Sequence, residues 1–388
     1  MTRGPALSLN QVSAPDGPLA FLRLGPERSR GRRFPELRHP YRNDFQRDRD
    51  RVIHTRAFRR LENKTQVFTP DLSDHFRNRL THSIEVSQMA RTVAIALGID
   101  ADLTEALALV HDIGHPPFAH SGEEELNRQM APYGGSFDHN IHALHIVEEF
   151  EQRYARFPGL NLTFEMREGI VKHSRDLTPG EKPDLDEYLP EKRPPLEAQL
   201  IDIADEIAYS AADLDDAQQA QFFTLDDVAR AVPAWGDLFE SIESMYPAAP
   251  KRVQFQESLR LLIDLLVSGF VEGTIAACRE AGVRSVDDVR DHPKRLARMT
   301  PDSGRTGQQL KQFLRKKVYF SEELKADRQR SIDMIGGLFR YFMDDVSRLP
   351  VGYAEQARER APHLVVCDYI AGMTDGFCAR MYEARNPS

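Results

Sequence analysis

Apolar residues recur at three- and four-residue steps along most of this 388-residue chain. In residues 81–97 the apolar positions on these steps are Ile84, Val86, Met89, Ala90, Val93 and Leu97. This spacing places them on one face of an α-helix, and Gly98 directly after them is typical of a helix end. Runs that alternate with the period of two expected for strands are scarce. The sequence therefore predicts an all-α fold.

The same periodicity predicts further helices along the rest of the chain. They cover residues 101–113, 140–155, 165–174, 197–220, 226–244, 254–281, 307–317, 322–348 and 364–383. Residues 175–196 hold five prolines and many charges, which predicts a long exposed loop. Residues 41–220 are expected to form a helical core, and residues 221–388 further helices packed on it.

Residues 1–40 are rich in proline, glycine and arginine, which predicts a basic extended arm; a solvated tail is the alternative. The chain carries 51 Lys and Arg against 60 Asp and Glu, a net charge of 51 − 60 = −9. A dedicated DNA-binding protein needs a positive excess, so that class is disfavoured. The basic arm leaves single-stranded nucleic acid open as a partner.

The three cysteines, Cys278, Cys367 and Cys378, show no metal-like spacing, and the N-terminus has no apolar secretory segment. The most apolar stretch, residues 259–271, contains two charges and is too short to span a bilayer. These features predict a soluble cytoplasmic protein with no membrane partner.

Seven of the 13 histidines lie within one short section of the chain. They are His82, His111, His115, His120, His139, His142 and His145. Neutral imidazoles near carboxylates suit a divalent transition metal. The adjacent pair His111 and Asp112 ends an apolar helix, and two such neighbours can flank one ion.

Two further side chains can complete this site from other predicted helices. His82 lies on the preceding helix, and Asp205 interrupts an otherwise apolar helical run. A lone buried carboxylate is costly unless it is paired or bound to metal. The predicted metal ligands are therefore His82, His111, Asp112 and Asp205.

Four sequence blocks in this order give the chain a specific resemblance. They read DRDRVIHTRAFRRLENKTQVF, RNRLTHSIEVSQMAR, LVHDIGHPPFAHSGEEELN and ADEIAYSAADLDDA. The chain resembles the HD superfamily of metal-dependent phosphohydrolases, and most closely its deoxyguanosine triphosphate triphosphohydrolase branch. The similarity is strong over residues 40–220 and looser beyond. It implies an HD-domain helical bundle with additional C-terminal helices.

The resemblance implies hydrolysis of a deoxynucleoside triphosphate to deoxynucleoside and inorganic triphosphate, by water attack at the α-phosphorus. The implied cofactor is Mn²⁺ or Mg²⁺, or another transition metal. The ion would act as a Lewis acid on the α-phosphate and help to activate water. Relatives form dimers, tetramers or hexamers, so a homo-oligomer is expected. Base preference among the dNTPs is not implied.

The resemblance also implies a catalytic group beside the metal. Residues 121–124 read as a capping box, which would place His120 just before a helix that carries Glu123. His120 is the expected general acid or base, with Glu123 as its partner. His139 is expected to contact phosphate or assist catalysis, and His115 to face the phosphates.

Substrate-binding residues follow from the same resemblance. Asp205, Tyr209 and Asp213 lie on one helical stripe, and the matching Tyr and Asp of relatives surround the deoxyribose 3′-OH. Gln66 matches a second 3′-OH ligand, and Arg79 a phosphate-binding arginine. Where some relatives have a phosphate-binding lysine, this chain has Glu206. Candidate replacements are Arg42, Arg47, Arg56, Arg59, Arg60, Lys64, Lys316 and Lys317.

Two other functions stay open at this point. One is another HD phosphohydrolase activity, on alarmones, cyclic nucleotides or monophosphates. The other is a catalytically silent regulator that binds single-stranded nucleic acid through the basic arm. The set Gln66, Tyr209 and Asp213 argues against the first, and the complete set of predicted metal ligands against the second.

Overall fold

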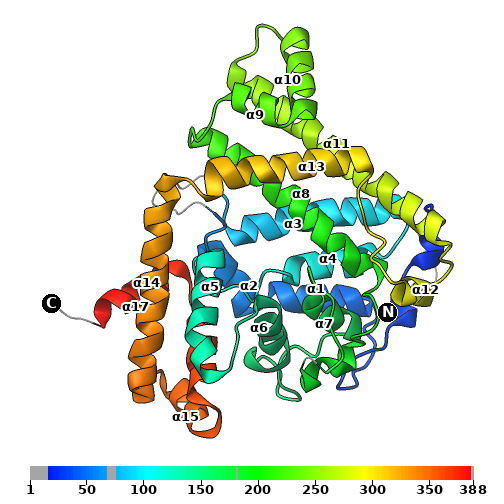
Figure 1. The fold of residues 1–388 in the computed structure, drawn as a ribbon. Coiled ribbons are helices and arrows are strands. Elements are labelled where there is room, and N and C mark those ends of the chain that lie inside the picture. Colours follow the sequence, from blue (N-terminus) through cyan, green and yellow to red (C-terminus); the bar gives the residue numbers. More distant parts are fainter. Residues whose placement is uncertain (1–15, 68–75, 181, 386–388) are drawn as a thin grey trace, which may run out of the picture.

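The computed structural model describes residues 16–67, 76–180 and 182–385. Throughout these ranges the chain forms helices and connecting turns, with two isolated backbone bridges and no strand (Figure 1). The predicted all-α fold is confirmed.

The core of the molecule is a bundle of five helices. They are α1 (Asp44–Ile53), α3 (Arg79–Leu97), α4 (Ala101–Val110), α7 (Phe164–Val171) and α8 (Leu196–Gln219). Helix α4 lies at its centre, in contact with the other four. Asn78 caps α3 with a capping box, and Gly98 ends it in the left-handed conformation, as its sequence predicts. Short elements extend the bundle: α2 (Arg56–Arg60), α5 (Ala119–Met130), α6 (His139–His145) and α12 (Val286–Asp291).

A second group of helices packs on α8. It contains α9 (Leu225–Ala231), α10 (Pro233–Met245), α11 (Lys251–Ala281) and α13 (Pro301–Leu314). The single helix predicted over residues 226–244 is wrong, because Pro233 cannot continue α9 and instead begins α10. By length and apolarity alone α11 would pass for a membrane-spanning helix, and 44% of its most apolar window is buried. A core helix passes the same test, so this is weak evidence for a membrane segment.

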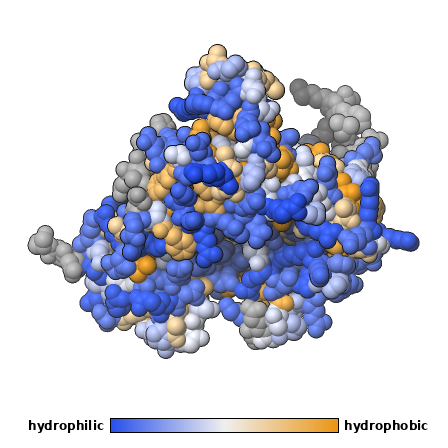
Figure 2. All heavy atoms as spheres, turned by 45° about the horizontal axis from the view of Figure 1, so that its top comes forward, coloured by the Kyte–Doolittle hydropathy of each residue, from blue (hydrophilic) through white to orange (hydrophobic). Residues whose placement is uncertain are grey.

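The C-terminal helices form a separate hydrophobic cluster against α5. They are α14 (Glu322–Asp344), α15 (Val351–Glu359), α16 (Pro362–Ala371) and α17 (Asp375–Ala384). Figure 1 shows α14 running alongside α5 at the edge of the bundle. The predicted helix over residues 364–383 is interrupted, because Thr374 caps a new helix after Gly372. On the face drawn in Figure 2, hydrophilic residues predominate and apolar residues form scattered patches.

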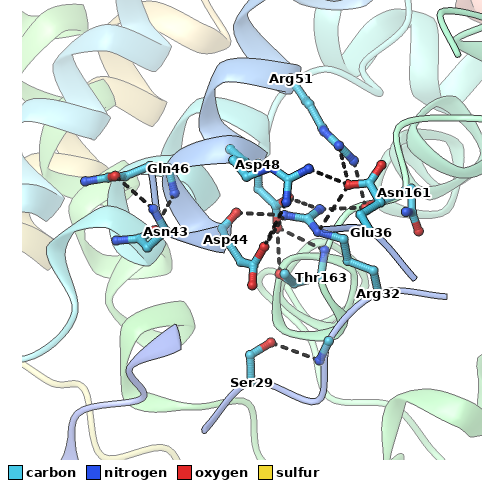
Figure 3. A network of polar contacts seen from close by, with 12 residues as sticks. Ser29, Arg32, Glu36, Asn43, Asp44, Gln46, Asp48, Arg51, Asn161 and Thr163 are labelled. Atoms are coloured by element: carbon cyan, nitrogen blue, oxygen red, sulfur yellow. Dashed lines mark hydrogen bonds and ion pairs between the residues drawn. The ribbon is translucent and has the colours of Figure 1, made fainter. Parts of the chain in front are cut away.

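The described part of the N-terminal arm packs along the bundle. Leu19, Leu22 and Leu24 are buried in the main core. Further along, Arg32 inserts between α1 and residues 161–163, where it pairs with the fully buried Asp48 and donates to the Asn161 carbonyl at 2.6 Å (Figure 3). These contacts already engage part of the positive charge that the sequence assigns to the arm.

The predicted exposed loop at residues 175–196 is only partly exposed. A 3₁₀-helix, Pro183–Tyr188, turns Leu185 and Tyr188 into the core, where the Tyr188 hydroxyl contacts Glu148 and Arg167. The prolines and charges correctly excluded a long helix. They did not reveal that two apolar residues anchor the segment.

One buried carboxylate fastens the arm and makes stability depend on pH. Glu197, at the start of α8, is fully buried and accepts hydrogen bonds from the backbone N–H groups of Leu24 and Asp100. Burial raises its pKa from 4.5 to about 7. The folded protein therefore favours the protonated acid, and stability falls as the pH rises from 4.5 through 7.

The substitution Glu197→Gln keeps an acceptor oxygen and removes this titration. We expect the variant to gain about 3 kcal/mol relative to the wild type between pH 4.5 and pH 8. Denaturant unfolding at several pH values measures the difference, with the exposed Glu240→Gln as the matched control. A stability difference that does not change with pH would contradict the assignment.

Candidate metal centre

Three separated elements bring the four predicted metal ligands together. Helix α3 carries His82, the turn after α4 carries His111 and Asp112, and α8 carries Asp205. His82 Nε2 lies 2.8 Å from Asp205 Oδ1 and 3.9 Å from Asp112 Oδ2. His111 Nε2 lies 3.4 Å from Asp112 Oδ1 and 3.7 Å from Asp205 Oδ1. These four potential ligands, the metal cluster of this protein, thus converge on one position.

The orientation of His111 suits a metal ligand. Its Nδ1–H donates to the Ala108 carbonyl at 2.6 Å, so in the neutral imidazole, the form that binds a metal, the lone pair is on Nε2. That Nε2 is buried and has no hydrogen-bond partner among the described residues. An unpaired buried nitrogen is costly, and a metal-bound histidine typically donates its other ring N–H to a carbonyl or carboxylate. The donor set of imidazoles and carboxylates fits a divalent cation.

The two carboxylates determine the protonation of the side chains at this position. Burial alone would raise the pKa of Asp112 and of Asp205, but the neighbouring histidines hold both well below the usual range. Arg79, which donates to Asp112 at 2.8 Å, contributes at that residue. Burial lowers the pKa of His111, but the two carboxylates outweigh it and raise that pKa to about 9. The cluster therefore attracts positive charge.

A second cluster of histidines lies beside the first. Ligand atoms of His115, His120 and Glu123 fall within 4.8 Å of one another. The His139 ring stacks on His115 with the centroids 4.0 Å apart, and His139 Nδ1 contacts Glu123 at 2.9 Å. Burial would raise the pKa of Glu123, but His139 lowers it to about 2. The carboxylate is therefore ionised near neutral pH and paired with His139.

This geometry changes the predicted pairing. Glu123 hydrogen-bonds to His139 and makes no hydrogen bond to His120. The predicted capping box is also wrong: α5 begins at Ala119, so His120 lies inside its first turn. Phe118 and Ala119 both have positive φ, 60° and 53°, which bends the chain sharply into α5. His120 is exposed, yet desolvation by the surrounding side chains and the nearby Arg79 lower its pKa.

Close packing at Gly114 brings the two clusters together. A Cβ at this position would collide with the His139 carbonyl and with the Ala143 backbone of α6. Glycine therefore lets the turn after Asp112 lie directly against the start of α6. This contact places His139 over His115.

The predicted substrate stripe on α8 meets side chains from α13 and from the π-helix Arg315–Tyr319 that continues it. Asp213 accepts a hydrogen bond from the Tyr319 hydroxyl at 2.5 Å, and its burial raises its pKa to about 7. Lys311 Nζ lies 6.0 Å from the centre of the Tyr209 ring and 3.4 Å from Glu206. A lysine from another helix thus lies beside Glu206 and Tyr209.

The segment that carries Gln66 is fastened by the C-terminal region. The preceding Thr65 N–H donates to Asp375 Oδ2 at 2.7 Å, and Asp375 Oδ1 accepts from the Phe118 N–H at 3.0 Å. Asp375 therefore joins the Gln66 segment to the turn that leads to His120. Among the described residues, Gln66 Oε1 is buried without a hydrogen-bond partner.

Most of the basic residues proposed as phosphate ligands lie elsewhere. Arg56, Arg59 and Arg60 line a cavity of about 550 Å³ between α2, α6 and the C-terminal helices. Arg42 and Arg47 line a smaller one of about 310 Å³. Neither of these two cavities is lined by a residue of the metal cluster.

The lysines in that set have other contacts. Lys317 pairs with Asp227 at 3.5 Å. Lys64 differs, since its ammonium group is buried and donates to the carbonyls of His115 and Ala371. Burial lowers the pKa of Lys64 to about 7, so it is a weakened cation. No contact of Lys316 with the site is found among the described residues.

Three residues at the site escaped the sequence reasoning: His173, Lys311 and Tyr319. His173 follows α7 and offers a ring nitrogen within 4.8 Å of ligand atoms of His111 and Asp205. It lies in no motif that singled it out. Lys311 and Tyr319 belong to the C-terminal half, where the resemblance is loose. Only their three-dimensional neighbours identify them.

Comparison with known proteins identifies the family. A model of the HD domain matches residues 79–210, and one of the phosphohydrolase-associated domain matches residues 297–384. The chain is 43% identical to the deoxyguanosinetriphosphate triphosphohydrolase-like protein of Azoarcus sp. (strain BH72), over 92% of this chain and 93% of that protein. The proteins of the same name from Caulobacter vibrioides and Geobacter sulfurreducens are 43% and 40% identical, over 91% and 90% of this chain and 92% and 90% of their own lengths. The chain belongs to the deoxyguanosinetriphosphate triphosphohydrolase-like family of HD-domain proteins.

The two matched regions of this HD-domain protein meet at the site. The HD match contains all four residues of the metal cluster, together with the histidine cluster. The phosphohydrolase-associated match contributes Lys311, Tyr319 and Asp375. The resemblance drawn from the sequence is confirmed, and the chain is a member of an HD-domain phosphohydrolase family.

Proposed function

We propose that this protein hydrolyses deoxynucleoside triphosphates to deoxynucleoside and inorganic triphosphate, by water attack at the α-phosphorus. The observation that carries the proposal is the convergence of His82, His111, Asp112 and Asp205 beside the Glu123–His139 pair. A metal site next to an acid–base pair suits phosphoester hydrolysis. The names of the relatives support a nucleoside triphosphate as substrate.

His82, His111, Asp112 and Asp205 would hold the divalent ion. Bound there, the ion supplies Lewis acidity to a phosphoryl oxygen and lowers the pKa of water. Two imidazoles favour Mn²⁺ or another transition metal over Mg²⁺, which prefers oxygen ligands. Arg79 keeps the Asp112 carboxylate in place and adds positive charge close to the α-phosphate.

The second cluster would handle protons. Glu123 is ionised and fixes His139 through Nδ1, so that Nε2 of His139 is the nitrogen able to exchange a proton. His115 and His120 lie in the same cluster with lowered pKa values, because burial and Arg79 disfavour their charged forms. Neutral imidazoles there can hydrogen-bond to phosphate oxygens or accept a proton from water. Cleavage between the 5′-oxygen and the α-phosphorus needs one such group near the leaving oxygen.

The stripe on α8 would recognise the sugar. Tyr209 is half-buried beside Lys311, and its ring would pack where a 2′-OH would extend. The Asp213–Tyr319 pair would accept or donate to the 3′-OH, together with Gln66.

Replacing Tyr209 with Ala should therefore weaken discrimination between dNTP and NTP. A steric gate of this kind is worth about 1–3 kcal/mol, so the ratio of kcat/KM values for dGTP and GTP should fall roughly 10- to 100-fold. Tyr209→Phe keeps the ring and is the control. An unchanged ratio in the alanine variant would remove Tyr209 from sugar selection.

Lys311 is our proposed replacement for the missing lysine at Glu206. Its ammonium group is 3.4 Å from that carboxylate, and a polyphosphate would compete with Glu206 for it. Lys311→Ala should raise KM for dNTP about tenfold, since one charge-assisted contact is worth about 1.5 kcal/mol. Steady-state kinetics measures this, and Lys316→Ala is the matched lysine control.

Chromatography of the products from each dNTP, after adding Mn²⁺ or Mg²⁺ to metal-stripped protein, tests the proposal as a whole. Free triphosphate and deoxynucleoside are the expected products. Stepwise release of single phosphates, or turnover only of alarmones or monophosphates, would favour another HD phosphohydrolase activity. Strong, salt-dependent binding of single-stranded DNA without turnover would favour the silent regulator.

The last part of the proposal concerns the cellular compartment and the partners of the protein. We propose a cytoplasmic enzyme, where dNTPs occur; Cys278, Cys367 and Cys378 are all buried free thiols, which suits a reducing compartment. Self-association stays a prediction, and so does binding of single-stranded nucleic acid by the basic arm.

A further inference from the structure

One histidine faces the metal cluster without a part in the proposed chemistry. His173 is buried directly after α7, and its ring lies edge-on to His111, with the centroids 5.3 Å apart and the planes at 70°. One of its ring nitrogens lies within 4.8 Å of ligand atoms of both His111 and Asp205. His173 therefore shares its neighbours His111 and Asp205 with His82, although it reaches the cluster from a different element.

A carboxylate of α8 lies against the ring of His173. Asp202 Oδ1, one helical turn before Asp205, lies 2.9 Å from His173 Nδ1, but off the direction that a hydrogen bond from Nδ1 requires. The same carboxylate oxygen accepts the N–H of Ser174 at 2.8 Å, where the backbone has a φ of 55°. The His173 carbonyl accepts from the Asn140 side chain at 2.9 Å. These contacts fix the backbone on both sides of the ring.

An arginine from a remote part of the chain completes this support. Arg295, which lies between the two regions matched by family models, contacts the other oxygen of Asp202. It also donates to the carbonyls of Lys172, at 2.6 Å, and Arg175. One guanidinium group thus holds both the carboxylate beside His173 and the main chain around it.

This arrangement matches the way proteins prepare a histidine for a metal. A small rotation of the ring would bring Nδ1–H onto Asp202, and the carboxylate would then hold the proton on Nδ1 and leave the lone pair on Nε2. Such carboxylate–histidine pairs orient the ligand and raise its basicity. A histidine that only fills space would have no need to face the unpaired Nε2 of His111 and the carboxylate of Asp205.

We propose that His173 is a fifth protein ligand of the divalent ion, oriented by Asp202 and Arg295. The inference rests on the proposed metal centre, and it adds a ligand that the HD motif does not contain. His173 would occupy a coordination position otherwise filled by water. The ion would then keep fewer exchangeable positions for phosphate and the attacking water.

Metal affinity tests this without any nucleotide. Calorimetric titration of the metal-stripped full chain with MnCl₂ should give one ion per chain. His173→Ala should weaken the Kd about 10- to 100-fold at unchanged stoichiometry, and Asp202→Asn should weaken it by a smaller factor. His145→Ala is the matched histidine control and should leave the Kd unchanged. An unaltered Kd in His173→Ala would overturn the proposal, as would two ions in the wild type falling to one.

A spectroscopic count separates ligation from a structural role. Electron spin-echo modulation of the Mn²⁺-bound protein should report three coordinated histidine nitrogens in the wild type and two in His173→Gln. Two nitrogens in both proteins would overturn the proposal, even if the substitution lowered affinity by loosening the fold.

The two proposals can fail separately. If the chain hydrolyses dNTPs but the Kd for Mn²⁺ is the same in His173→Ala as in the wild type, the proposed function stands and this inference is wrong. If manganese binding depends on His173 as stated but no dNTP is hydrolysed, the function falls and the ligand assignment stands.

Discussion

Replacing His111 with Ala and Asp112 with Asn in one variant should abolish stoichiometric binding of divalent metal. We also expect dNTP turnover to fall at least 10⁴-fold, because the Lewis acid and the activated water would be lost together. His111 and Asp112 are adjacent, and both reach the position faced by His82 and Asp205. With the His111 imidazole and the Asp112 carboxylate gone, too few ligands remain at this position to hold an ion.

The side effects of this change can be predicted from the neighbours. Asp112 is the buried partner of Arg79, whose exposure is only 3%. Removing one member of a buried ion pair typically costs 3–5 kcal/mol, because the other charge is left uncompensated. For this reason Asn is used at position 112: its amide oxygen can still accept from Arg79. Thermal unfolding of the variant shows whether the fold survives.

The controls and readouts separate metal loss from misfolding. Metal content is measured on dialysed protein by mass spectrometry, and turnover with Mn²⁺ in excess. His54→Ala changes an exposed histidine at the end of α1 and should alter neither. A folded double variant that still carried one ion per chain would show that the ion lies elsewhere.

The helices that matter for this site could be predicted because they are periodic and clearly bounded. Asn78 and Gly98 mark the ends of α3, and the apolar face between them follows the helical repeat. The four convergent ligands lie on such elements or directly after one. Residue identity and order along the chain were therefore enough to propose them as a group.

What escaped prediction depends on contacts between distant segments. The partner of Glu123 could not be read from spacing: His120 is nearer in sequence, but the close approach at Gly114 brings His139 to it instead. Nothing in the sequence around Lys311 indicates that α13 crosses α8 beside Tyr209. Likewise, the arginines of α2 belong to a basic run that is conspicuous in the sequence, yet they line a cavity separate from the metal cluster.

Contacts between distant segments also join the phosphohydrolase-associated region to the proposed site. Asp375 holds the backbone of Thr65 and Phe118, and the Ala371 carbonyl accepts from Lys64. Both segments lead into residues of the proposed site. The C-terminal helices therefore act on the site by holding its loops, and a truncation before α16 would release them.

The second large effect concerns the proton-transfer pair. Glu123→Gln and His139→Ala should each lower kcat by about 10²–10⁴, the usual contribution of general acid–base catalysis. Because Glu123 acts by orienting His139 through the 2.9 Å contact, the double variant should be no slower than the slower single one. Metal content should stay at the wild-type level in all three, since neither residue belongs to the metal cluster.

His120→Ala resolves the remaining ambiguity in this cluster. His120 makes no hydrogen bond to Glu123, yet their ligand atoms lie within 4.8 Å of each other and His120 is exposed. If His120 is a separate acid or base, His120→Ala should lower kcat. The factor by which it lowers kcat should then multiply with the factor for Glu123→Gln in the double variant. If it only binds phosphate, KM should rise while kcat changes little. Wild-type kinetics in His120→Ala would exclude both roles. For the other pair, losses of kcat that multiply in the Glu123→Gln, His139→Ala double variant would show that Glu123 and His139 do not act as a unit.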